Sequence, residues 1–184
     1  MRIFPFLIAC LFTSTFAHAQ DADNNHSSST VPVPNKSFIA ELGGPGVLFS
    51  ANFDTRFTKS PLGFGGRIGI GFVTADQSIY DPNSGYYDYK QRSVLTVPLQ
   101  LNYLFGKPNS VNAFEVGLGA TYIGKKLDIF DYYEENATQV LGTASFMYRR
   151  MPKDGGFSWR IGFTPLFANG LIQPFGAVSV GYNF

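Results

Sequence analysis

Four charged residues are the first candidates for chemistry in this chain of 184 residues. Glu41 and Glu115 supply carboxylates, and Arg67 and Arg160 supply guanidinium groups, each within a run of alternating apolar residues. Opposite charges of this kind either line a polar channel or neutralise one another as ion pairs in a closed interior. Both interpretations require that the four side chains point to the same side of a sheet.

A catalytic use of these carboxylates would need a positioned base or nucleophile. Acyl transfer or deacylation, for example, uses a serine activated by a histidine and a carboxylate. The sequence has only two histidines, His18 and His26, and both precede the alternating runs. We therefore expect no catalytic residues and no enzymatic activity, and the sequence indicates no cofactor.

A short segment, Asp81-Pro82-Asn83-Ser84-Gly85, superficially resembles a calcium-binding loop. In such a loop glycine occupies the sixth position and a glutamate ligand occupies the twelfth. Here the glycine comes one position early, and Arg92 stands at the twelfth position. Asp-Pro and Asn-Ser-Gly are ordinary turn formers, so we expect a turn and no metal site.

The two longest connections, residues 75–91 and 124–136, are rich in tyrosine and acidic residues. Tyrosine makes large contacts at a low cost in conformational entropy, which is typical of binding surfaces. Alternatively, the strands extend beyond a membrane and the tyrosines form an aromatic girdle at its surface. The residue pattern leaves both interpretations open.

The remainder of the chain alternates apolar and polar residues with a period of two, which is typical of β-strands. The segments Ser37–Leu42 and Val47–Asp54 are separated by Gly43-Gly44-Pro45-Gly46, a strong turn signal. Pro98 and Pro165 lie within two later segments and are each expected to mark a bulge or a strand end. In all, eight strands are predicted, the other six at residues 64–74, 95–105, 114–122, 139–149, 157–167 and 178–184.

The position of the charges decides which face of these strands is enclosed. All charged residues assigned to strands lie on the polar face: Glu41, Asp54, Arg67, Glu115, Arg149 and Arg160. A lysine or arginine that faces lipid costs about 2–4 kcal/mol at the bilayer midplane. Short and long connections also tend to alternate, and aromatic residues gather near strand ends, as in transmembrane barrels.

We therefore predict an all-β fold, an eight-stranded antiparallel up-and-down transmembrane β-barrel over residues 37–184. Its apolar face would contact lipid. Glu41, Arg67, Glu115 and Arg160 would form a polar network in the lumen, because a barrel of eight strands has room for little more than its own side chains.

The residues before the barrel have the pattern of a targeting segment. An apolar run, Ile3–Phe12, follows Arg2, and Ala17-His18-Ala19 is a cleavage pattern, so residues 1–19 are predicted to be a secretory signal peptide. The run is too short for a membrane anchor, and it continues past Cys10, unlike a lipoprotein signal. Residues 20–36 are polar and predict a flexible lead-in. The formal net charge of +1 argues against a nucleic-acid partner.

The chain ends in Val178-Ser179-Val180-Gly181-Tyr182-Asn183-Phe184. With the signal peptide and the strands, this terminus resembles the small outer-membrane β-barrel proteins of Gram-negative bacteria (the outer membrane protein beta-barrel domain family, of eight-stranded, OmpA/OmpX-like architecture). Residues 41–44, 97–107 and 163–167 look like segments that recur in that family. The resemblance implies a location in the cell outer membrane, surrounded by lipid. It also implies that Val180, Tyr182 and Phe184 form an assembly signal read by the barrel-assembly machinery.

The family has no agreed activity, so the resemblance does not specify a role. We expect a monomeric, non-catalytic barrel with a structural or surface-interaction role. A small porin-like pore, or a ligand-binding or transport barrel, is the alternative. A soluble, secreted, lipocalin-like barrel is the second alternative.

Overall fold

The computed structural model describes residues 33–82, 85–108, 110–127 and 138–184. The contacts of the chain divide it into residues 1–30 and residues 31–184, and the first of these units lies outside the described residues. The predicted signal peptide, His18, His26 and most of the predicted lead-in therefore lie outside them too.

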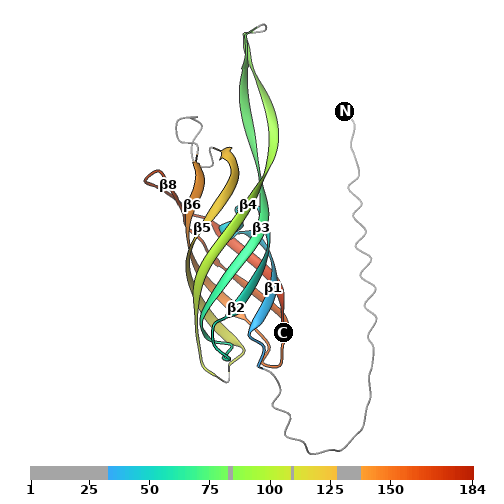
Figure 1. The fold of residues 1–184 in the computed structure, drawn as a ribbon, viewed down its shortest axis with the longest axis vertical. Coiled ribbons are helices and arrows are strands. Elements are labelled where there is room, and N and C mark those ends of the chain that lie inside the picture. The colour runs from blue at the N-terminus through green and yellow to red at the C-terminus, as the bar shows by residue number, and fades with distance from the viewer. Residues whose placement is uncertain (1–32, 83–84, 109, 128–137) are drawn as a thin grey trace, which may run out of the picture. The chain divides into compact units, whose positions relative to one another are not determined.

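Within the described residues the chain is almost entirely β-structure (Figure 1). The elements are β1 (Lys36–Gly43), the short 3-10 helix η1 (Gly44–Gly46), β2 (Phe49–Arg56), β3 (Gly63–Asp81), β4 (Tyr86–Gly106), β5 (Asn112–Leu127), β6 (Thr138–Arg150), β7 (Gly156–Phe163), β8 (Leu166–Ala168), β9 (Leu171–Gln173) and β10 (Gly176–Asn183). No helix in this part of the chain is long and apolar enough to cross a membrane.

Eight of the strands close into an antiparallel barrel. Strands β1 to β6 each pair with the next along the chain, β7 pairs with β10, and β10 pairs with β1. At the closing seam, the amide of Lys36 donates to the carbonyl of Phe184 at 3.1 Å, and the amide of Phe184 donates back at 2.9 Å. The predicted all-β, eight-stranded up-and-down fold is confirmed.

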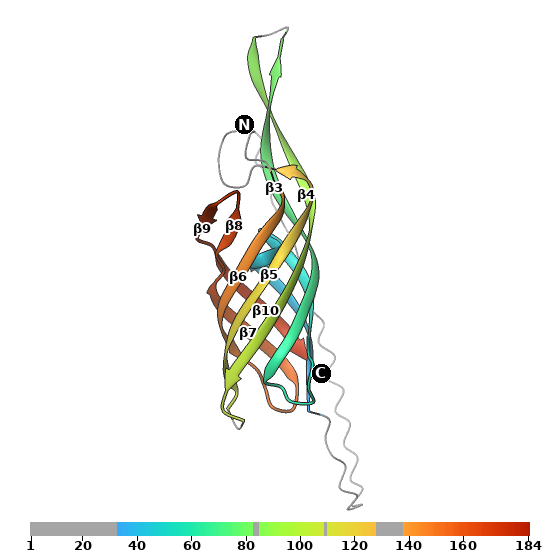
Figure 2. The ribbon, with the colours of Figure 1, turned by 60° about the vertical axis from the view of Figure 1, so that its left-hand side comes forward.

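The strands β3 and β4 are much longer than the rest of the wall and rise above it as a two-stranded ribbon (Figures 1 and 2). Their ladder continues to the pair Asp81↔Tyr86. Residues 75–91, interpreted from the sequence as a connection, are therefore mostly strand, because the two segments satisfy each other's backbone groups. The alternative interpretation, strands that extend beyond the wall, describes this ribbon. The side chains of residues 75–81 and 87–92 lie outside the description.

The connection after β7 also differs from the prediction. Strand β7 ends at Phe163, not at residue 167, and Pro165 marks that end as expected. Residues 166–173 then form the small β8–β9 hairpin, which pairs with β6 through Thr143↔Leu166 (Figure 2). Leu166 is fully buried, as an inward-facing residue of a continuing strand would be. The alternation of residues therefore could not distinguish this hairpin from a longer β7.

Two further boundaries differ from the sequence prediction. Pro98 marks neither a bulge nor a strand end. The β3–β4 ladder omits Gly69 and Ile70, but it resumes at Gly71↔Thr96 in the same register, and strand β4 continues through Pro98. Strand β5 continues to Leu127, so only the later part of the predicted connection 124–136 follows it. Residues 128–137, with their acidic and aromatic run, lie outside the described part of the chain.

Candidate functional site: the closed lumen

The barrel encloses its charged side chains and exposes its apolar ones. All six charged residues predicted to face inward are buried, with Glu115 completely enclosed and Arg149 only 4% exposed. Outward residues of the same strands are large and apolar, and Phe38, Leu99 and Leu118 are each 60–70% exposed. This arrangement is the reverse of a soluble barrel, in which the apolar face is the enclosed one.

Glu115 on β5 is the centre of the charged network. Its Oε1 accepts hydrogen bonds from Nη2 of Arg67 on β3 at 2.5 Å and from Nη1 of Arg160 on β7 at 2.9 Å. Its Oε2 accepts from Nη1 of Arg149 on β6 at 3.3 Å. One buried carboxylate thus joins three arginines from three different strands.

Glu41 on β1 extends this network to the seam of the barrel. Arg160 donates through Nη2 to Oε2 of Glu41 at 2.5 Å and through Nε to Ser179 on β10 at 2.6 Å. The structure therefore brings together all four residues proposed for the lumen from the sequence, with Arg160 and Glu115 linking Glu41 to Arg67. Arg67 also donates to Oε1 of Gln100 at 3.0 Å.

A second carboxylate, Asp54 on β2, is the centre of another group of polar contacts, nearer the edge that carries the chain ends. It accepts a hydrogen bond from Nη1 of Arg149 at 2.6 Å and from the amide of Asn102 at 3.2 Å, and it forms an ion pair with Arg56. Arg149 also reaches Ser37 at 2.9 Å. Sequence reasoning did not assign Arg56 to the lumen because the second strand was ended at Asp54. Continuing the alternation by two residues would have found it.

The turn between β1 and β2 folds into the lumen above this charged layer. Gly44, Pro45 and Gly46 of η1 are all buried. Thr96 donates to the carbonyl of Gly46 at 3.0 Å, and Thr121 donates to the carbonyl of Pro45 at 2.6 Å. Two strands on the far side of the barrel thus hold the turn inside.

Val47, which follows the turn, corrects a prediction from the sequence. The alternation in the predicted strand Val47–Asp54 puts it on the lipid face in phase with Phe49, but it is only 5% exposed and packs inside. The chain reaches this position through a φ of 74°, a conformation that a β-branched residue rarely adopts. The turn therefore breaks the alternation, which cannot be extended across it.

Val47 belongs to an apolar cluster that fills the lumen toward the ribbon end. Its members come from β3, β4, β5, β6 and β8, and Phe175 packs against them; they are Val47, Val73, Val94, Ile123, Leu141, Leu166 and Ala168. Charged side chains, the inserted turn and this cluster therefore occupy successive levels of the interior. A filled lumen of this kind favours the interpretation of ion pairs in a closed interior over a polar channel.

The calcium-like segment of the sequence lies at the tip of the β3–β4 ribbon. Asp81 ends β3 and Gly85 lies in the tight turn before β4, with a φ of 71°; residues 83 and 84 of the calcium-like segment lie outside the description. Among the described residues, no group of three or more histidine, cysteine or acidic side chains is placed to hold a metal ion.

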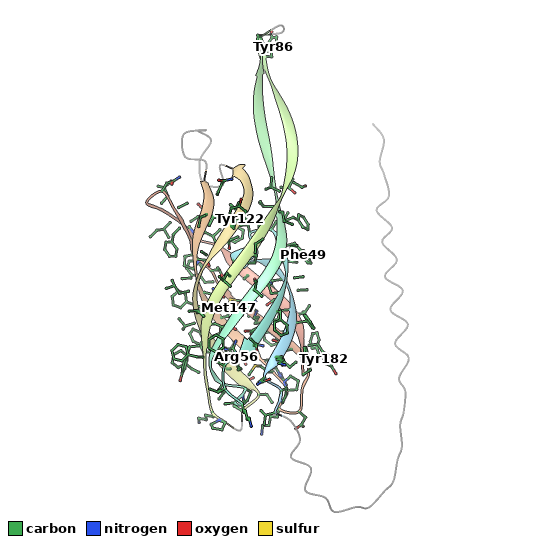
Figure 3. All side chains as sticks on the ribbon, in the orientation of Figure 1. Phe49, Arg56, Tyr86, Tyr122, Met147 and Tyr182 are labelled. Atoms are coloured by element: carbon green, nitrogen blue, oxygen red, sulfur yellow. The ribbon has the colours of Figure 1, made fainter. Side chains whose placement is uncertain are left out.

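The C-terminal residues proposed as an assembly signal lie on the outer wall. Val180, Tyr182 and Phe184 are 47%, 61% and 47% exposed, and the ring of Phe184 stacks on Phe38 with centroids 5.4 Å apart. In Figure 3, Tyr182 lies on the outside of the barrel toward the edge with the chain ends.

Comparisons with known proteins agree with this architecture. No family model matches the sequence, and no curated protein matches it. Among solved structures, the chain is similar to the N-terminal β-barrel domain of Pseudomonas aeruginosa OprF, with a TM-score of 0.54, 12% identity, and coverage of 83% of this chain and 98% of that one. It also resembles the Yersinia pestis outer membrane protein Ail, determined in a phospholipid bilayer nanodisc, with a TM-score of 0.48, 13% identity, and coverage of 82% and 99%. The fold is thus that of a small barrel like the one in OprF.

Proposed function

We propose that this chain is an integral outer-membrane β-barrel with a closed lumen, which displays the β3–β4 ribbon outside the membrane as a surface for binding other proteins. The observation that carries the membrane location is the inversion of the barrel. A continuous wall of exposed phenylalanine, leucine, isoleucine and valine surrounds an interior of buried arginines and carboxylates. Such a wall is stable against hydrocarbon and would aggregate in water.

The orientation follows from the two edges of the barrel. The edge with both barrel termini carries the short turns at residues 57–62, 107–111 and 151–155, and the opposite edge carries the ribbon. Short turns face the periplasm and longer connections face outward in barrels of this kind. The ribbon therefore projects from the cell surface.

The surface role rests on the unpaired edges of that ribbon. The ladder of β2 with β3 ends at Phe49↔Phe72, and the ladder of β4 with β5 begins at Thr96↔Ile123. Beyond these pairs, residues 73–80 and 87–94 pair only with each other in the described part of the chain. An exposed strand edge is a template for adding an extended segment of another protein. Tyr86 at this tip is 78% exposed and would add contact area.

We propose no catalytic role. The lumen holds arginines, carboxylates, amides and hydroxyls that are largely bonded to one another, and both histidines of the sequence precede the barrel. Acid–base chemistry near neutral pH would need a group of histidine-like pKa within reach of a substrate.

The membrane location is tested by electrophoresis of the outer-membrane fraction with and without boiling. A folded barrel resists detergent, so we expect unheated and boiled protein to migrate differently. Identical migration, with recovery of the protein in the soluble fraction, would contradict the assignment.

The orientation is tested with two single-cysteine variants. The only cysteine of the sequence is Cys10, which lies in the predicted signal peptide. A membrane-impermeant maleimide should label Gly85→Cys, at the ribbon tip, on intact cells. It should label Lys107→Cys, in a short turn at the opposite edge, only after the outer membrane is permeabilised. The reverse pattern would place the ribbon in the periplasm and would overturn the surface role.

A further inference from the structure

The outer wall has a depression in a place where the neighbouring side chains are large. An open groove of about 690 Å³ crosses β10, β1, β2 and β3 on the outside of the barrel. Its floor is formed by Ala40 and Ala51, which are directly paired across β1 and β2. Both point outward and are exposed.

The strand register shows why the wall is hollow at this level. The outward row through the floor is Val180, Ala40, Ala51 and Ile70, so two methyl groups lie between two branched side chains. The next row toward the chain ends is Tyr182, Phe38, Phe53 and Ile68. The row on the other side is Val178, Leu42, Phe49 and Phe72. Larger residues above and below thus enclose a dent of alanine size.

A cation stands at the membrane edge of the same face. Along β1 the outward positions are Lys36, Phe38, Ala40 and Leu42, and Lys36 is exposed. From Lys36 to Ala40 is a step of four residues, which in an extended strand spans about 13 Å, or about 10 Å of depth in the membrane at the usual strand tilt. The groove therefore lies within the periplasmic half of a hydrocarbon core about 30 Å thick. Lys36 lies near the level of the headgroups.

We propose that this face is a binding site for one phospholipid of the periplasmic leaflet, with an acyl chain in the Ala40–Ala51 groove and its phosphate on Lys36. The inference rests on the proposed membrane location. An empty groove in hydrocarbon would forfeit dispersion contacts on both of its sides, and its lining is predominantly apolar, as an acyl chain requires. Among the described residues that line the groove there is no cation to attract a phosphate, and Lys36 supplies that charge.

The site is tested with the complete barrel refolded into vesicles of phosphatidylethanolamine and phosphatidylglycerol. The vesicles contain a phospholipid with a photoreactive diazirine in the middle of one acyl chain. We expect crosslinks to concentrate on the segments 36–56 and 176–184. Ala51→Leu fills the floor and should reduce that labelling severalfold, and Lys36→Gln should reduce it to a smaller extent. Ala120→Leu is the matched control, because Ala120 is an outward, exposed residue away from the groove.

The outcomes separate the lipid site from the membrane location. Uniform labelling around an inserted barrel, unchanged by Ala51→Leu, would overturn the groove as a site and leave the location intact. Failure of the unmodified chain to insert into vesicles would overturn both. A covalent or mass-detected dimer that Ala51→Leu abolishes would show that a second copy occupies the groove, and this would also overturn the lipid proposal.

Discussion

Arg160 on β7 and Glu115 on β5 are joined across the lumen by a hydrogen bond of 2.9 Å, although their strands are separated in the wall by β6. The same guanidinium donates to Glu41 on β1, which is separated from β7 by β10. Backbone ladders connect only adjacent strands. The side-chain network therefore supplies the contacts that hold opposite parts of the wall at a fixed distance.

Removal of the charge on Glu115 should destabilise the barrel more than removal of the charge on Glu41. Glu115→Gln leaves Arg67, Arg149 and Arg160 without their common anion, whereas Glu41 forms an ion pair with Arg160 alone in the described part of the chain. Breaking a buried pair costs about 3–5 kcal/mol. The free energy of unfolding in urea, measured in detergent, should therefore fall by about that amount in E115Q and by less in E41Q. Equal losses would show that Glu115 is not the centre of the network.

A side chain at Gly44 should destabilise the barrel, because the position of Gly44 is restricted by the same network. A Cβ at Gly44 would lie 2.8 Å from the carboxyl group of Glu41, which is held in turn by Arg160. Gly170, at the β8–β9 turn, has a similar positive φ of 79° and no atom within 4 Å of such a Cβ. Gly170→Ala should cost about 1–2 kcal/mol from backbone conformation alone. Gly44→Ala should cost about 1–3 kcal/mol more, from the weakened charged hydrogen bond.

Urea unfolding of the two alanine variants, side by side, separates backbone strain from the clash. Similar losses in both would mean that Glu41 moves aside without cost, and that the turn is not fixed by the charged layer beneath it.

The alternation of residue types predicted the faces of the strands but not their ends. Each charge on the polar face proved to be buried, because one lipid-facing arginine costs more than most single contacts contribute. Alternation carries no information about where a partner strand stops. That is why Arg56 was missed and why Val47, beyond a turn, was assigned to the wrong face. The length of the β3–β4 ribbon was hidden for another reason, since strands outside a membrane need no apolar face.

The sequence predicted which residues lie together in the lumen, but not which of them pair with one another. The sequence indicated that Glu41, Arg67, Glu115 and Arg160 share an enclosure. The central place of Glu115 depends on strand stagger and on the positions of three arginines around the barrel. Neither quantity can be read from spacing along the chain.

The unmodified barrel should conduct little in planar lipid bilayers. The charged layer, the inserted turn and the apolar cluster around Leu141 and Leu166 fill successive levels of the lumen and so obstruct the passage of ions. Arg67→Ala with Arg160→Ala removes two long side chains, takes away the arginine paired with Glu41, and leaves Glu115 with Arg149. This variant should show brief, cation-selective openings. Stable, ion-selective channels from the unmodified protein would instead support the pore alternative.

The ring of Phe184 should matter more for insertion in cells than for the stability of the folded barrel. Phe184→Ala keeps the two backbone hydrogen bonds with Lys36 and removes only the ring stacked on Phe38. A fully buried aromatic side chain contributes about 1.5–3 kcal/mol, and this ring is 47% exposed on the outer wall. Its loss should leave protein refolded in detergent barrel-like and only slightly less stable. Phe157→Ala is the matched control, since Phe157 is also outward near the same edge and is 64% exposed. If Phe184 is read as an assembly signal, F184A should lower the amount of protein in the outer membrane while F157A does not. Equal insertion of the two variants, with a larger stability loss in F184A, would make Phe184 an ordinary residue of the aromatic wall.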